Sequence, residues 1–158
     1  MALSSSYSIQ SQINPRLLQA VYIGCVKQNP NISAWPWPHF SRIEVACRHC
    51  GQGYYWPAFM NALEDLRTHM ARPIIIHSAH RCALHNARVG GAPLSQHLKL
   101  AVDISLKRHN LRDLARTARG AGFTGFGFYT TFLHLDMGRP RHWFGGLEAR
   151  TLWQTYLD

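Results

Sequence analysis

Residues 123–136 read FTGFGFYTTFLHLD and predict two short strands joined by a tight turn at the paired threonines. Apolar and polar side chains alternate in the second strand. His134 and Asp136 therefore share one face, whereas Leu133 and Leu135 point the other way, into the core. Two polar side chains on an otherwise apolar strand are costly to bury unless a partner satisfies them. The stretch therefore predicts a sheet with a polar site on one face.

The rest of the chain predicts helices and strands that do not alternate strictly. Apolar side chains recur at helical or strand spacing in five further segments. These segments are helices over 57–70, 110–120 and 147–157, and strands over 74–78 and 101–106. We therefore expect an α+β fold, a single domain with a small, mostly antiparallel sheet flanked by helices.

The first 39 residues predict an N-terminal helical extension to a domain over residues 40–158. Asn14-Pro15 is a favourable start for a helix, and apolar residues recur at helical spacing until about Lys27. The stretch 35–38, Trp-Pro-Trp-Pro, predicts an extended linker, because each proline disfavours helix at the residue before it. Its tryptophans either tuck against the domain or bind a partner.

The chain is strongly basic, with seventeen Lys and Arg residues against eight Asp and Glu residues and a net charge of +9. Such a surface favours anionic partners such as nucleic acid, acidic lipid or bacterial wall polymer. Four arginines lie at nearly helical spacing and predict one basic helix face. This face is either solvated or docks onto an anionic wall polymer or a nucleic acid. The four arginines are Arg108, Arg112, Arg116 and Arg119.

Composition excludes wholesale disorder, since 46% of the residues are hydrophobic and only 16% are charged. No apolar run approaches the ~20 residues that a membrane span needs. Residues 1–12 lack the cationic and apolar regions of a secretory signal. We therefore expect a protein without a membrane span, made in the cytoplasm without a signal peptide.

Four cysteines are too few for a disulfide scaffold in a chain of 158 residues. Cys47 and Cys50 have the C-x-x-C spacing of half a zinc site, but no second pair of that kind follows. Structural thiols or a local disulfide would explain this spacing. A metal ion that Cys82 or His49 also binds is the other explanation.

A metal site on the polar face of the sheet is a more specific hypothesis than a metal site at the cysteine pair. His97 closes a loop, and Asp103 lies in the strand just after it. Two imidazoles, including that of His134, and one carboxylate can bind a divalent cation and leave a fourth tetrahedral position for water. The alternative is that His134 is an ordinary core or rim histidine with a satisfied ring.

Several ordered segments resemble the D-alanyl-D-alanine carboxypeptidase-like zinc peptidases, and above all their phage and prophage endolysin branch. The segments are FSRIEVAC over 40–47, IHSAHRC over 76–82, VGGAPLSQH over 89–97, and 125–136 with Arg141 and Trp143 behind it. The resemblance covers about residues 40–146. It implies a zinc metallopeptidase that hydrolyses an amide bond in the peptidoglycan stem peptide, as a carboxypeptidase or an endopeptidase.

The same resemblance implies a place of action at the bacterial cell wall or periplasm, in phage lysis or wall penetration, after release or as a virion component. The implied partner is the peptidoglycan stem peptide, and a nucleic acid is not expected, since no binding motif for one is recognisable.

The family pattern implies zinc as cofactor, bound by His97, Asp103 and His134. Arg81 matches the family arginine that stabilises negative charge on the substrate carbonyl. Asp136 is the candidate general base, with the roles of ligand-orienting residue or partner of Arg81 left open.

Three further residues are candidate substrate contacts. Ser95 is expected mainly to shape the loop of His97, His80 to pack beside Arg81, and Trp143 to line the cleft or close the core.

The sequence departs from the family pattern at two points. The family motif SxHxxGxAxD has one residue more between its His and Asp, and the loop 98–100 must absorb the difference if Asp103 is to face the metal. Many relatives place an acidic base three residues before the last His, where this chain has Thr131. These departures leave open an alternative, a catalytically impaired peptidoglycan-binding or virion structural protein with the same fold.

Overall fold

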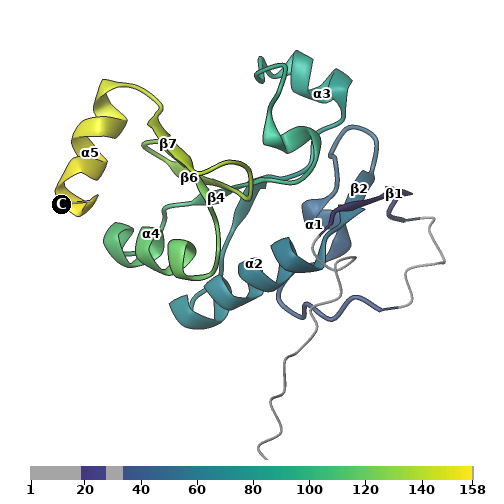
Figure 1. Ribbon diagram of the computed structural model, residues 1–158, viewed down its shortest axis with the longest axis horizontal. Coiled ribbons are helices and arrows are strands. Elements are labelled where there is room, and N and C mark those ends of the chain that lie inside the picture. Colours follow the sequence, from purple (N-terminus) through teal and green to yellow (C-terminus); the bar gives the residue numbers. More distant parts are fainter. Residues whose placement is uncertain (1–18, 28–33, 158) are drawn as a thin grey trace, which may run out of the picture.

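The computed structural model describes residues 19–27 and 34–157, which form an α+β fold (Figure 1). The strands are β1 (Val21–Cys25), β2 (Gln52–Tyr55), β3 (Ile76–Ser78), β4 (Val102–Ser105), β5 (Gly125–Phe128), β6 (Phe132–Asp136) and β7 (Arg141–Phe144). The helices are α1 (Arg42–Val45), α2 (Pro57–Met70), α3 (Ala83–Arg88), α4 (Leu111–Gly120) and α5 (Leu147–Leu157), with a short 3-10 helix, η2 (Gln96–Leu98).

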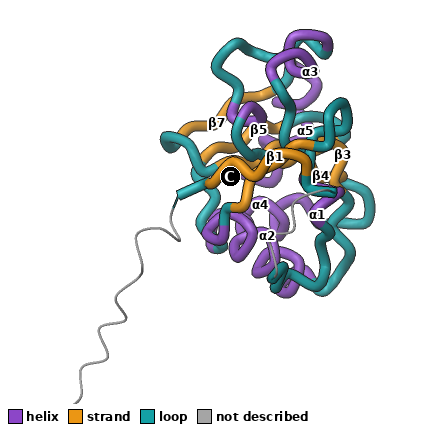
Figure 2. The backbone as a smooth tube through the Cα atoms, turned by 90° about the vertical axis from the view of Figure 1, so that its right-hand side faces the viewer, coloured by secondary structure: helices purple, strands orange, loops and turns teal. Residues whose placement is uncertain are grey.

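The main sheet has five strands in the order β3-β4-β6-β5-β7, and a separate two-stranded sheet pairs β1 with β2. All pairings in the main sheet are antiparallel except that of β5 with β7. Figures 1 and 2 show α2 and α4 on one side of this sheet and α3 on the other. The expected α+β class with a small, mostly antiparallel sheet is confirmed.

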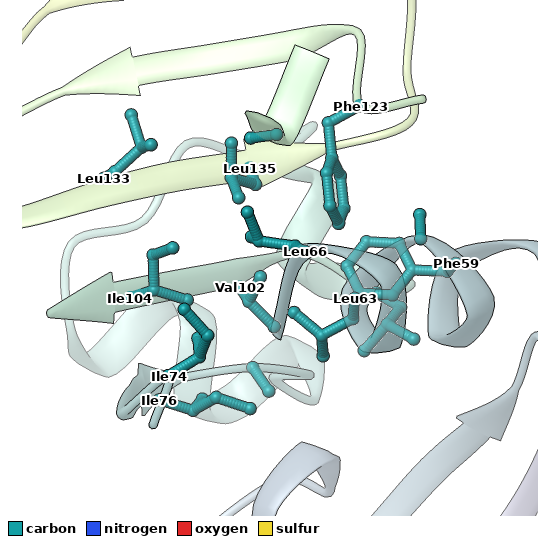
Figure 3. Close-up of a cluster of buried hydrophobic side chains, with 14 of the residues drawn as sticks. Phe59, Leu63, Leu66, Ile74, Ile76, Val102, Ile104, Phe123, Leu133 and Leu135 are labelled. Atoms are coloured by element: carbon teal, nitrogen blue, oxygen red, sulfur yellow. The ribbon is translucent and has the colours of Figure 1, made fainter. Parts of the chain in front are cut away.

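The core lies between the main sheet and the helices α2 and α4. Side chains of α2 point toward the apolar faces of β4 and β6 in Figure 3. The fully buried members of this contact are Phe59, Leu63 and Leu66 of α2, Val102 and Ile104 of β4, and Leu133 and Leu135 of β6. Each contributes roughly 1.5–3 kcal/mol by leaving water. Because strand side chains alternate, this packing turns the polar residues of β4 and β6 to the opposite face.

The helix boundaries follow from local signals. Pro57 is the first residue of α2, and the helix ends at Ala71, which adopts a left-handed φ of 51° two residues before Pro73. The Asn110 side chain caps α4 by accepting a hydrogen bond from the Asp113 backbone N–H at 3.0 Å.

The predicted N-terminal helix is wrong over the residues that the structure describes. Residues Val21–Cys25 form β1, which pairs antiparallel with β2, and the part of the expected helix over 14–18 lies outside the described residues. Val21, Tyr22 and Ile23 are β-branched or aromatic and favour a strand. The neighbouring strand supplies backbone hydrogen bonds, whereas a short isolated helix is only marginally stable.

The two linker tryptophans pack against the domain. The Trp37 indole is buried and donates to Asn61 Oδ1 of α2 at 2.8 Å. The Trp35 indole donates to the Phe40 carbonyl at 2.6 Å, and its ring meets that of Trp37 edge-on. The first of the two expected roles, tucking against the domain, is therefore confirmed.

Three of the four spaced arginines lie on α4, but Arg108 precedes the helix and has a left-handed φ of 66°. The predicted basic helix face is therefore wrong for Arg108, because the helix begins only after its N-cap residue, Asn110. Arg116 is exposed and pairs with Asp113 at 2.9 Å.

Among the helices within residues 19–27 and 34–157, none combines the length and apolarity that crossing a membrane requires.

Candidate metal centre

Three ligand-type side chains meet on the polar face of the main sheet. Asp103 of β4 and His134 of β6 are direct partners in the strand register, and His97 of η2 lies over them. Asp103 Oδ1 lies 3.1 Å from His97 Nε2 and 2.9 Å from His134 Nδ1, and the two nitrogens are 3.1 Å apart. All three side chains are buried. We call this group the His-Asp-His cluster.

The far nitrogen of each ring in the cluster faces a hydrogen-bond acceptor. His97 Nδ1 lies 2.6 Å from the Ala79 carbonyl, and His134 Nε2 lies 2.9 Å from Asp136 Oδ2. Because a carbonyl and a carboxylate accept, these nitrogens carry the protons in the neutral rings. The two near nitrogens then present lone pairs to each other and to Asp103. Three acceptors that face one another in a buried space are satisfied by a cation.

The shorter spacing between His97 and Asp103 is absorbed before β4 begins. The 3-10 helix ends at Leu98, Lys99 takes the irregular φ and ψ of −109° and −90°, and Leu100 is buried in the core. The register between β4 and β6 is unbroken, so Asp103 still faces the cluster. This is the outcome that the loop at 98–100 was expected to produce.

Charged neighbours hold the two carboxylates in their ionised forms. Arg81 donates from Nη2 to Asp103 Oδ2 and from Nε to Ser78 Oγ, both at 2.9 Å. Arg141 donates to both oxygens of Asp136, at 2.8 and 2.7 Å. Asp136 is therefore the partner of Arg141 and not of Arg81.

The electrostatics of the cluster favour positive charge at its centre. Burial raises the pKa of the Asp136 carboxyl, but hydrogen bonds from His134 and Arg141 outweigh burial and place that pKa well below its usual range. Burial likewise lowers the pKa of His134, and here the carboxylates of Asp103 and Asp136 dominate and raise it. A positive charge, whether a proton or a metal ion, is thus stabilised between these residues.

Glycines on β5 make room for the side chains of this face. Gly127 pairs with His134 on one side and with Trp143 on the other. A Cβ atom on Gly127 would lie 2.5 Å from Trp143 Cζ2 and 2.9 Å from His134 Cβ. The missing side chain therefore lets the indole lie across the strand with its ring centroid 5.1 Å from that of His134.

The substitution Gly127→Ala is expected to destabilise the protein by about 1–3 kcal/mol, because the added methyl group displaces Trp143 or His134 from a packed position. Urea unfolding followed by tryptophan fluorescence measures the change. Gly120→Ala is the matched control: Gly120 lies at the end of α4, and no atom beyond its chain neighbours and the helix's own backbone lies within 4 Å of the added carbon. We expect a change within ~0.5 kcal/mol. Equal unfolding midpoints for the two variants would contradict the packing argument.

A cleft of about 370 Å³ opens beside the cluster. Its lining combines the cluster with Arg81, a small-residue loop and three aromatic rings. The lining residues are Arg81, Val89, Gly90, Gly91, Ala92, Ser95, His97, Asp103, Tyr129, Phe132, His134 and Trp143. Larger hollows lie elsewhere, for example against Arg112 and Tyr156 at α4 and α5, but among the described residues they contain no group of three or more metal-ligating side chains. The cleft beside the cluster is therefore the candidate reaction site.

The candidate substrate contacts occupy different positions. Trp143 lines the cleft and donates from its indole to the Tyr129 hydroxyl at 3.1 Å. Ser95 also lines the cleft, and its hydroxyl caps η2 by accepting from the His97 N–H at 3.2 Å. His80 is buried outside the cleft lining, with Nδ1 3.1 Å from the His97 carbonyl and its ring edge-on to Tyr54. His80 therefore supports the loop of His97.

Sequence reasoning assigned no role to three groups that shape this site. Arg141 neutralises Asp136, the Ala79 carbonyl orients His97, and Tyr129 adds a hydroxyl to the cleft. A signal for Arg141 exists in hindsight, because a buried aspartate on a strand requires a cation nearby. The role of the Ala79 carbonyl leaves no trace in residue identity, since every residue carries such a group.

A single-domain α+β fold with a buried His-Asp-His cluster at a cleft defines a protein with a candidate mononuclear metal centre. The family model described as Peptidase M15 matches residues 38–136, which contain Arg81 and the whole cluster. The chain therefore belongs to the peptidase M15 family, whose members are metal-dependent peptidases, and the resemblance seen in the sequence is confirmed at that level. A search of the curated proteins finds no match.

Proposed function

We propose that the chain is a zinc peptidase that cleaves an amide bond in the peptidoglycan stem peptide, as a carboxypeptidase or endopeptidase in phage lysis or wall penetration. The observation that carries the proposal is the His-Asp-His cluster, in which three buried acceptor atoms face one another within 3.1 Å. Membership of the M15 family supports a metallopeptidase, and the motifs around Arg81 and His97 support the peptidoglycan substrate.

The donor set fits zinc, since two imidazole nitrogens and one carboxylate oxygen are the ligands of many catalytic zinc sites with an open fourth position. A bound zinc ion supplies a Lewis acid for the scissile carbonyl and lowers the pKa of water toward ~7. His97, Asp103 and His134 would hold it, and the Ala79 carbonyl and Asp136 keep the two rings oriented.

Arg81 is the proposed oxyanion-stabilising residue. Two hydrogen bonds, to Asp103 and to Ser78, hold its guanidinium at the wall of the cleft. A fixed cation there stabilises negative charge that develops on the substrate carbonyl oxygen, because it needs no reorganisation during the reaction. Trp143 and Phe132 also line the cleft and offer apolar surface to the peptide.

The identity of the general base distinguishes an active enzyme from an impaired one. Among the described residues that line the cleft, Asp103 is the only carboxylate, and Thr131 is exposed at the family position of the base. Asp136 lies behind His134, on the nitrogen that faces away from Asp103. This placement favours a positioning role for Asp136, and it keeps a peptidoglycan-binding protein with lost turnover as the second candidate function.

Purified sacculi provide the test of the proposed function. The zinc-loaded protein is incubated with them, and the released muropeptides are identified by mass spectrometry. We expect shortened or separated stem peptides whose masses name the bond that is cut, no such products after chelation, and recovery on adding zinc back. Binding to sacculi without any change in muropeptide masses would replace the peptidase by the binding protein.

A further inference from the structure

A second group of metal-type side chains lies outside the His-Asp-His cluster. Cys47 and Cys50 flank the turn that follows α1, and Cys82 is the N-cap of α3. Their three sulfur atoms all lie within 4.8 Å of one another, and none of the three is in a disulfide. Cys47 is buried, and the other two are half-buried. We call this group the cysteine cluster.

Two imidazoles reach the same cluster. His85 Nδ1 lies 3.5 Å from Cys47 Sγ, and His49 Nδ1 lies 3.5 Å from Cys82 Sγ. A tetrahedral zinc ion with ordinary bond lengths places two sulfur ligands about 3.8 Å apart and a sulfur and a nitrogen ligand about 3.6 Å apart. The two sulfur–nitrogen distances match this geometry, and the three sulfur atoms lie close enough together to share one ion.

Backbone N–H groups point at the sulfur atoms. The Cys82 N–H donates to Cys47 Sγ at 3.3 Å, and the His85 N–H donates to Cys82 Sγ at 3.4 Å. Such donors stabilise the negative charge that a thiolate ligand brings to a metal site. A local disulfide would use two of the three sulfur atoms and would leave the third thiol and both imidazoles without a function.

We propose that Cys47, Cys50, Cys82 and His85 form a structural zinc site that is separate from the His-Asp-His cluster. His85 is assigned as the fourth ligand because it is half-buried on α3 and its own N–H already binds Cys82, whereas His49 is exposed. Three thiolates and one imidazole close the coordination sphere, so the site has no open position for a substrate. The sequence pattern showed only half of this site, since Cys82 and His85 lie more than thirty residues away.

The proposed site holds the segment on which the His-Asp-His cluster depends. Cys82 directly follows Arg81, and the Arg81 N–H donates to the His97 carbonyl at 2.7 Å. Ala79, three residues before Cys82, orients the His97 ring through its carbonyl. A zinc ion that ties Cys82 to the turn at Cys47 therefore fixes the loop of Arg81 against the domain.

Metal counting on the full chain, purified under reducing conditions, tests the proposal without any substrate. We expect about two zinc ions per chain by elemental mass spectrometry, about one after His134→Ala, and about one after Cys50→Ser. Cys25→Ser is the matched control, since Cys25 lies on β1 outside the cysteine cluster, and we expect it to keep both ions.

Cobalt substitution of the His134→Ala variant gives an independent spectroscopic readout, in which the cysteine cluster itself is unchanged. We expect the near-ultraviolet thiolate-to-cobalt charge-transfer absorption in this variant, and its loss after His134→Ala is combined with Cys50→Ser. Absence of this absorption from the folded His134→Ala protein, or a disulfide among the three cysteines in the protein as purified, would overturn the site. Zinc retained after His85→Ala but lost after His49→Ala would overturn the assignment of the fourth ligand.

Discussion

Replacing His134 by alanine is expected to release one metal ion per chain and to lower the peptidase activity by about a thousandfold or more, since metal activation supplies several kcal/mol to such reactions. His134 contributes the nitrogen nearest to Asp103 Oδ1, at 2.9 Å. Without it, only one imidazole and one carboxylate remain, and a tetrahedral zinc ion held by two protein groups dissociates readily.

The fold should survive this substitution, because Asp136 keeps both hydrogen bonds from Arg141. Metal content and the rate of muropeptide release are measured on the same preparation, with far-ultraviolet circular dichroism as the check on folding. His69→Ala is the control: His69 is an exposed histidine on α2, across the sheet from the cluster, and we expect it to change neither quantity. Full activity in folded His134→Ala protein would exclude the His-Asp-His cluster as the reaction centre.

Asp136→Asn is expected to weaken metal binding about 10–100-fold, which is the usual effect of losing a carboxylate that orients a histidine ligand. It should also lower the free energy of unfolding by about 3 kcal/mol at neutral pH, because the Arg141 guanidinium loses a fully buried charged partner. Urea unfolding and competition with a metal chelator measure the two effects.

The pH dependence of stability separates this charge effect from packing. The pKa of Asp136 is lowered in the folded protein, so its contribution to stability is fully present above the ordinary aspartate pKa of ~4 and is lost as the pH falls below that value. The difference in stability between wild type and Asp136→Asn should therefore shrink on acidification. Asp113→Asn, at an exposed pair with Arg116, is the control and should cost no more than ~1 kcal/mol.

Activity of Asp136→Asn at saturating zinc decides between the two roles left open for Asp136. A positioning residue acts through metal affinity, so excess zinc should restore most of the activity. If kcat stays low although the metal site is filled, Asp136 is the general base despite its place behind His134, and the positioning role is refuted.

Local patterns predicted much of the main sheet and its helices. Alternation in Phe132–Asp136 indicated which side chains share a face, and proline and asparagine signals indicated where α2 and α4 begin. Helical spacing misled the prediction for Val21–Cys25, because a strand partner more than twenty-five residues away outweighed the local preference.

The sequence by itself determined which residues could serve as metal ligands and which of them share a face of one strand, since side-chain chemistry and the two-residue period of a strand are local properties. Only the tertiary structure decided that Asp103 lies opposite His134, that Asp136 pairs with Arg141, and that Cys82 reaches the turn after α1. These contacts join segments that are distant in the chain. They depend on strand register and on packing against a shared core, and no short stretch of sequence encodes either.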